Sequence, residues 1–189
     1  MNPFKRYIVW LSRMSHSRGF GVQSPSAYRF IRYVLCEHYP YYAYAELRRS
    51  YPRAGWLTRK RMELYFRLAN FRQAERFVSN GSDGEMLAAY VGGGCRRTRV
   101  VGDVEGGAAV EMARVCPADG CEEFLGRILA HADNATVVIV EDIAASAVSR
   151  RMWQTLLDSS AVSVSYDLYW AGVAFFDTDR FKTNYIVNF

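Results

Sequence analysis

Apolar side chains recur at helical spacing in much of the chain. This spacing predicts helices over residues 3–14, 25–37, 43–49, 58–71, 85–91, 105–115, 122–132 and 147–157. Ser24 before Pro25, and Thr58 further on, are typical N-terminal caps. In the helix over 58–71, Met62 and Tyr65 belong to an apolar stripe, and Arg67 is expected to face away from it.

Other apolar runs are short and follow the pattern of strands. Residues 76–80, 98–104 and 135–143 are three strand candidates, and Val137–Val140 is continuously apolar, as in a strand covered on both faces. Three more candidates, 162–169, 171–177 and 184–189, follow in succession. The order predicts an α/β fold: a Rossmann-like, mostly parallel sheet with antiparallel C-terminal strands and an N-terminal helical extension.

The length of 189 residues, half of them apolar, suits a single core with an appendage. We expect a helical extension over residues 1–57, packed on a shortened Rossmann-like domain over 58–189. The apolar patch Tyr7–Leu11 is too short for a signal peptide or a membrane span, which predicts a cytoplasmic protein.

Residues that follow the predicted strands are candidates for chemistry, because ligands of parallel sheets bind beyond the carboxyl ends of the strands. The first strand leads into Gly81 and Gly84, whose backbone could approach a ligand, and Asp103 ends the second strand, where an acid can bind ribose hydroxyls. A tight turn with Asp83 as a helix cap explains the same glycines equally well.

Glu141 and Asp142 follow the most apolar strand. They are candidates for positioning a substrate or a cation, although Asp142 could instead cap the next helix. The cysteines have no CxxC spacing and no histidine cluster beside them, so no metal site is expected and the thiols are read as free. No P-loop motif is present.

Charge is distributed unevenly along the chain. Residues 1–76 hold 15 Lys and Arg against four Asp and Glu, and nine of the 13 tyrosines. Such a segment could meet nucleic acid or an anionic membrane surface, or it could solvate helices that lie against an acidic remainder. The tyrosines are also compatible with a homodimer contact.

Several longer stretches resemble a known family. They are GFGVQSPSAYRFIRYVL, YYAYAELRR, ELYFRLANF, and a C-terminal run from VVIVEDI to YIVNF. In them the chain is similar to a family of class I S-adenosylmethionine-dependent methyltransferases of Bacteroidetes-type bacteria. The C-terminal part is the most specific, with Asp142, Met152–Trp153, Asp167–Leu168, Gly172 and Phe175–Phe176 at the family's positions.

The chain departs from the family's pattern in three places. The acid before the glycine loop is replaced by Ser79 or Asn80, and the histidine and tryptophan after the late strand are absent from EDIAAS. A further strand of the family is missing before its Asp-Gly pair. Asp119–Gly120 stands where that pair is expected, and the strand before it is expected to shrink to Ala113–Ala118.

The resemblance implies roles for named residues. Gly81 and Gly84 would hold S-adenosylmethionine, Asp103 would hold its ribose, and Asp119 would help to place a small-molecule substrate. Ser79, where the acid would fall, is counted with the cofactor residues, and Glu141 and Asp142 stay substrate-site candidates from their position after the strand. The departures predict a methyltransferase-like protein with weakened or lost catalysis. The alternative is a non-catalytic scaffold or binding protein of the same fold that uses its basic, tyrosine-rich N-terminal part.

Overall fold

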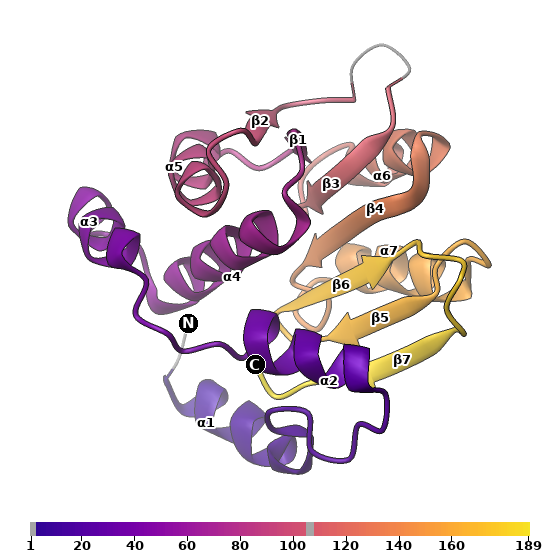
Figure 1. The fold of residues 1–189 in the computed structure, drawn as a ribbon, viewed down its shortest axis with the longest axis horizontal. Coiled ribbons are helices and arrows are strands. Elements are labelled where there is room, and N and C mark those ends of the chain that lie inside the picture. Colours follow the sequence, from indigo (N-terminus) through magenta and orange to yellow (C-terminus); the bar gives the residue numbers. More distant parts are fainter. Residues whose placement is uncertain (1–2, 105–107) are drawn as a thin grey trace. The chain divides into compact units, whose positions relative to one another are not determined.

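A computed structural model describes residues 3–104 and 108–189 and contains the α/β sheet expected from the sequence (Figure 1). The chain folds into two compact units. The first comprises Met1–Glu75, Asp83–Arg99 and Asn188–Phe189, and the second comprises Arg76–Ser82 and Val100–Val187. The expected domain boundary after residue 57 stays a prediction.

The first unit is helical. Its elements are α1 (Pro3–Ser12), the 3-10 turn η1 (Met14–His16), α2 (Pro25–Phe30), the π-helical turn η2 (Ile31–Leu35), α3 (Tyr42–Ser50), α4 (Trp56–Arg72) and α5 (Gly84–Gly94). Ser24 caps α2 as expected, since its hydroxyl accepts the Ala27 N–H at 3.4 Å. Helix α4 begins at Trp56 after Gly55, so Thr58 lies inside the helix and not at its cap.

Helix α4 is buried on most of its surface, because Leu64 and Leu68 are covered as fully as the apolar stripe expected from the sequence. Arg67 was expected to face away from this stripe, but that side of the helix is buried as well. Its guanidinium is buried and donates to the carbonyls of Val34 (2.6 Å) and Leu35 (3.2 Å) and to the Tyr44 hydroxyl (3.2 Å). The buried cation therefore satisfies the end of η2 and joins it to α3 and α4.

Helix α5 was expected to end at residue 91, but it continues through Gly92, Gly93 and Gly94. At Gly94 a Cβ atom would lie 2.1 Å from the Phe66 carbonyl oxygen, so the backbones of α4 and α5 touch where this residue has no side chain. Gly94 is thus required by close helix packing.

The second unit contains most of the sheet. Within the described residues the sheet has seven strands in the order β2-β1-β3-β4-β6-β5-β7. Their bounds are β1 (Arg76–Ser79), β2 (Arg99–Val101), β3 (Val110–Val115), β4 (Ala132–Glu141), β5 (Val164–Asp167), β6 (Ala171–Phe175) and β7 (Thr183–Ile186). Strands β1, β3 and β4 are parallel neighbours, whereas β6 pairs antiparallel with both β4 and β5.

Strand β3 corrects two expectations. Residues 108–115 of the expected helix over 105–115 contain this six-residue strand, and 105–107 lie outside the described residues. The strand before Asp119 was expected to shrink to Ala113–Ala118, yet it spans Val110–Val115 between two parallel neighbours. Helix-forming residues become a strand here because the interior of the sheet buries both of its faces.

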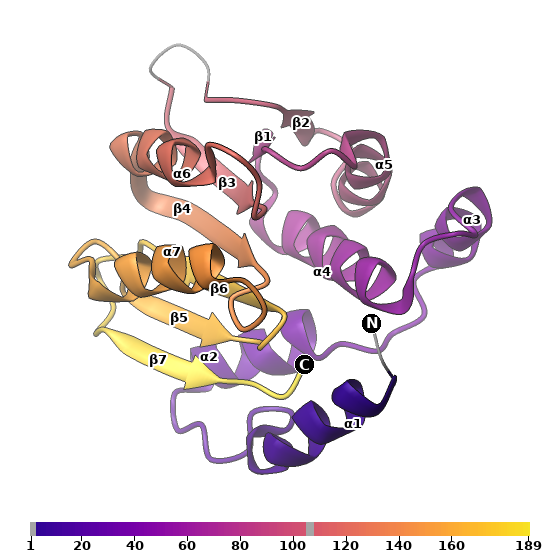
Figure 2. The same ribbon diagram turned by 180° about the vertical axis from the view of Figure 1, so that it is seen from behind.

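Helices α6 (Cys121–Ala130) and α7 (Ala147–Asp158) cover one face of this sheet (Figure 2). Alternate residues of the strands point into their shared core, including Val78, Ala113 and Val138. Trp153 of α7 packs so closely on Gly172 of β6 that a Cβ atom there would lie 2.5 Å from the indole. Residues singled out by the family resemblance thus meet in one contact.

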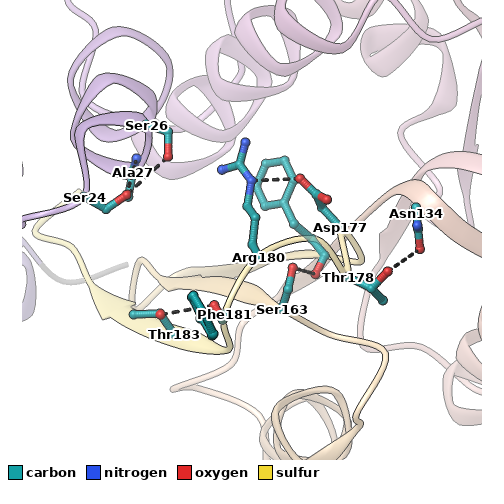
Figure 3. A network of polar contacts seen from close by, with 11 residues as sticks. Ser24, Ser26, Ala27, Asn134, Ser163, Asp177, Thr178, Arg180, Phe181 and Thr183 are labelled. Carbon is teal, nitrogen blue, oxygen red and sulfur yellow. Dashed lines mark hydrogen bonds and ion pairs between the residues drawn. The ribbon is translucent and has the colours of Figure 1, made fainter.

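Two side-chain hydrogen bonds involve the connection from β6 to β7. Arg180 donates to the Asp177 carboxylate at 2.8 Å, and Thr178 donates to the side-chain oxygen of Asn134 at 3.0 Å (Figure 3). Phe181 projects from this connection and is 96% exposed. Among the residues described, no helix has both the length and the apolar character needed to cross a membrane.

Candidate functional site

The strand order creates a switch point beside β1. From β1 the chain adds β2 on one side and then β3 on the other. In open parallel sheets, ligands bind at such a point, beyond the carboxyl ends of the two diverging strands. Here those ends are Ser79–Asn80 after β1 and Val115–Cys116 after β3.

The ends of β1 and β3 are bonded directly to each other by one side chain. The Asn80 amide nitrogen donates to the Cys116 carbonyl at 3.0 Å, and the Cys116 N–H donates to the Asn80 side-chain oxygen at 2.7 Å. This pair extends the β1–β3 ladder by one step beyond its last backbone pairing. The side chain of Asn80 therefore lies between the carboxyl ends of β1 and β3, at the switch point of the sheet.

The ends of β1 and β3, with the residues that follow them, form a rim of the sheet, and a buried arginine lies just inside it. Arg114 of β3 is fully buried, its Nε donates to the Ser79 hydroxyl at 2.9 Å, and its Nη1 lies 3.6 Å from the Glu141 carboxylate. Arg114 stands opposite Ser79 in the register, on the sheet face away from α6 and α7, because its neighbours Ala113 and Val115 point into the core beneath those helices. The three side chains therefore link β1, β3 and β4 across one face of the sheet.

The glycine turn after β1 is used in part by the same network. Ser79 Oγ also accepts the N–H of Gly81 at 3.2 Å, so a backbone donor that a ligand could have used is already bonded. Gly84 belongs to the other compact unit, where it begins α5. Asp83 precedes it at the cap position, but its side chain makes no capping bond to the helix.

Asp103, expected to hold a ribose, lies on the surface and is paired with Arg127 of α6. Arg127 Nε and Nη2 donate to its two oxygens at 3.0 and 3.3 Å, and the Val104 N–H donates to it at 2.8 Å. The hydrogen bond from Val104, and next the one from Arg127, lower the pKa of the Asp103 carboxyl. The Asp103 carboxylate is thus ionised and already hydrogen-bonded to Arg127 and Val104.

Of the remaining candidates, Glu141 belongs to the network of Arg114 and Ser79, whereas Asp119 and Asp142 do not. Asp119 is exposed in the turn before α6, and Glu141 faces Arg114. Asp142 has a left-handed backbone (φ 58°), and its carbonyl accepts the N–H groups of Ala145 and Ser146 at 2.9 Å each. It forms the turn after β4 and does not cap α7, where Ser146 takes that position.

The residues at this rim can be compared with the needs of S-adenosylmethionine. This molecule presents a sulfonium, an ammonium group and ribose hydroxyls, so its site must offer oxygen acceptors. The acceptors here are already bonded: Asn80 to Cys116, Glu141 to Arg114, and Asp103 to Arg127. The Arg114 guanidinium thus neutralises the Glu141 carboxylate that lies at this rim. In this conformation the residues do not fit the cofactor.

Sequence reasoning missed Asn80 and Arg114 as the residues that determine this rim. A signal was present for Arg114, since VEMARV places one arginine in an otherwise largely apolar run. Asn80 was noted only as a replacement for an acid. Among residues 3–104 and 108–189, no cluster of three or more His, Cys, Asp or Glu side chains is placed to hold a metal ion.

Comparisons with known proteins give only distant structural likenesses. No protein-family model matches the chain, and no curated protein matches it. Among solved structures, it is similar to the O-methyltransferase TomG from Streptomyces achromogenes, which is involved in tomaymycin synthesis and was solved in complex with SAM. The identity is 16% and the TM-score 0.47, over 71% of this chain and 89% of that one. A likeness this distant does not carry a function to the present chain.

Proposed function

We propose that the chain is an S-adenosylmethionine-dependent methyltransferase-like protein in which cofactor binding and methyl transfer are weakened because the cofactor rim is closed on itself. The observation that carries the proposal is the two-bond pair between Asn80 and Cys116, at the switch point of the sheet. A ligand at this rim must first displace that pair.

The size of the effect follows from the bonds to be broken. Each hydrogen bond contributes about 0.5–1.5 kcal/mol net, so opening the pair costs about 1–3 kcal/mol. When only the open form binds, the apparent affinity falls by the open fraction, which is a loss of about 5- to 150-fold. Methyl transfer depends on close placement of cofactor and acceptor, so a loosely held cofactor also loses rate.

Isothermal titration calorimetry with S-adenosylmethionine and S-adenosylhomocysteine tests the proposal. We expect the wild-type chain to bind with a dissociation constant near or above about 1 mM. The Asn80→Ala variant, which cannot form the pair, should bind at least about fivefold more tightly. In that variant, Asp103→Ala should abolish binding, whereas Asp179→Ala, at an exposed acid of the β6–β7 connection, should not.

Two results would contradict the proposal. Micromolar binding by the wild-type chain would show that the rim is an ordinary cofactor site. Absence of heat from both the wild-type chain and Asn80→Ala would show that closure of the rim is not what limits binding, and that this fold has no residual cofactor site there.

A further inference from the structure

Helix α1 carries an apolar stripe on its outer side. Phe4, Tyr7, Ile8 and Leu11 recur at i, i+3, i+4 and i+7, and they are 69%, 59%, 50% and 61% exposed. This spacing places them on one side of a helix. Val9, on the opposite side, is the buried residue of α1. The helix therefore has an apolar face, but that face points away from its own core.

The orientation of α1 is fixed within the first unit. Its Arg6 guanidinium lies 4.3 Å above the ring of Trp56 in α4. The Asn188 side chain donates to the Trp10 carbonyl at 3.1 Å and to the Ser17 hydroxyl at 3.0 Å. These contacts hold the side of α1 opposite the stripe, so the stripe stays directed outward.

The segment that carries the stripe is basic, although Arg6 is held against Trp56 on the opposite side of the helix. The first 36 residues contain no Asp or Glu and six Lys or Arg: Lys5, Arg6, Arg13, Arg18, Arg29 and Arg32. Met14 and Phe20, which follow α1 in the chain, are further exposed apolar side chains, at 57% and 78%. Exposed apolar side chains and basic side chains thus occur together in one N-terminal segment.

We propose that α1 docks on an anionic lipid surface, with the stripe among the acyl-chain boundary and the basic side chains beside the phosphates. Interfacial helices combine an apolar face with Lys and Arg, and their binding grows with the apolar area buried and with the negative charge of the lipid. Each Lys or Arg near such a surface contributes attraction that salt screens. A ten-residue helix gives reversible, peripheral binding.

Charge favours lipid over the two other occupants of an apolar face. A second copy would bring an equally basic segment against this one, and like charges oppose that contact. Nucleic acid would attract the arginines, but its phosphates and base edges would not use an outward row of Phe, Ile and Leu. An anionic membrane matches both features.

Vesicle co-sedimentation of the full chain tests this proposal, with phosphatidylcholine alone and with phosphatidylcholine that contains phosphatidylglycerol. We expect binding to the anionic vesicles only, weakened by high salt. Leu11→Asp should reduce the partition coefficient at least about tenfold. The matched control is Phe181→Asp, which makes the same charge change at a side chain that is 96% exposed in the β6–β7 connection, and should leave binding unchanged (Figure 3).

Circular dichroism should show both variants folded, because neither side chain is buried. The proposal is overturned if the wild-type chain does not bind anionic vesicles, or if Leu11→Asp binds them as well as wild type. It is also overturned if sedimentation velocity shows a dimer that Leu11→Asp dissociates while vesicle binding is absent. Salt-sensitive nucleic-acid binding without vesicle binding would equally refute it.

Discussion

The buried pair of Arg114 and Glu141 can be tested by a double-mutant cycle. Its members differ in exposure: the Arg114 side chain is fully buried, whereas the Glu141 side chain is 11% exposed. Removing one partner of a buried ion pair leaves a charge without compensation and typically costs about 3–5 kcal/mol. Replacing both partners with apolar residues of similar volume is often neutral or stabilising.

The exposure difference ranks the single variants. Glu141→Met leaves a guanidinium that cannot lose its proton and has no access to water, so we expect the full loss of about 3–5 kcal/mol. Arg114→Met leaves a carboxylate that reaches some solvent, so we expect a smaller loss of about 2–3 kcal/mol. The double variant should lie within about 1 kcal/mol of wild type.

Urea unfolding followed by far-UV circular dichroism measures these differences. With a slope of about 2 kcal/mol per molar urea, the Glu141→Met midpoint should fall by about 1.5–2.5 M. The double variant should recover most of this loss. If its loss equals the sum of the two single losses, Arg114 and Glu141 do not stabilise each other, and the sheet-spanning network is not energetically coupled.

The strands were largely predictable because their pattern is local. Val137–Val140 lies within β4, and the three C-terminal candidates are β5, β6 and β7. Strand β3 was not predictable in this way, because Glu111 and Arg114 interrupt its apolar pattern and its residues favour helix. What makes Arg114 acceptable inside a sheet is Ser79, 35 residues earlier, and Glu141, 27 residues later. The apolar periodicity within a strand does not indicate partners that lie so far away in the sequence.

The turn after β1 was predictable from the sequence, whereas the contacts of its side chains were not. The sequence located the loop after β1, and the resemblance led us to expect Ser79 or Asn80 there in place of an acid. In the structure, the Ser79 hydroxyl accepts hydrogen bonds from the Arg114 guanidinium and the Gly81 N–H. The Asn80 side chain forms two hydrogen bonds with the backbone of Cys116. A carboxylate in this loop would compete with Glu141 for Arg114, whereas a hydroxyl and an amide complete the hydrogen bonds of the closed rim.

Two further changes test the packing and titration of the helical unit. Gly94→Ala should destabilise the fold by about 3 kcal/mol in urea unfolding, because its Cβ would meet the Phe66 carbonyl, whereas Gly92→Ala, whose Cβ meets nothing within 4 Å, should stabilise it by about 0.5–1 kcal/mol. Equal effects of the two substitutions would refute the close helix contact. Burial raises the pKa of Tyr44 to about 12. The folded state thus prefers the protonated phenol, so its contribution is complete below about pH 10, the ordinary tyrosine value, and is lost as the pH rises through about 12. Between about pH 10 and 12, the unfolding free energy of the wild-type chain should fall more steeply than that of Tyr44→Phe. The difference in slope should be about 1.4 kcal/mol per pH unit, which corresponds to one proton. An unchanged slope would show that this phenol ionises as readily in the folded chain as in the unfolded one.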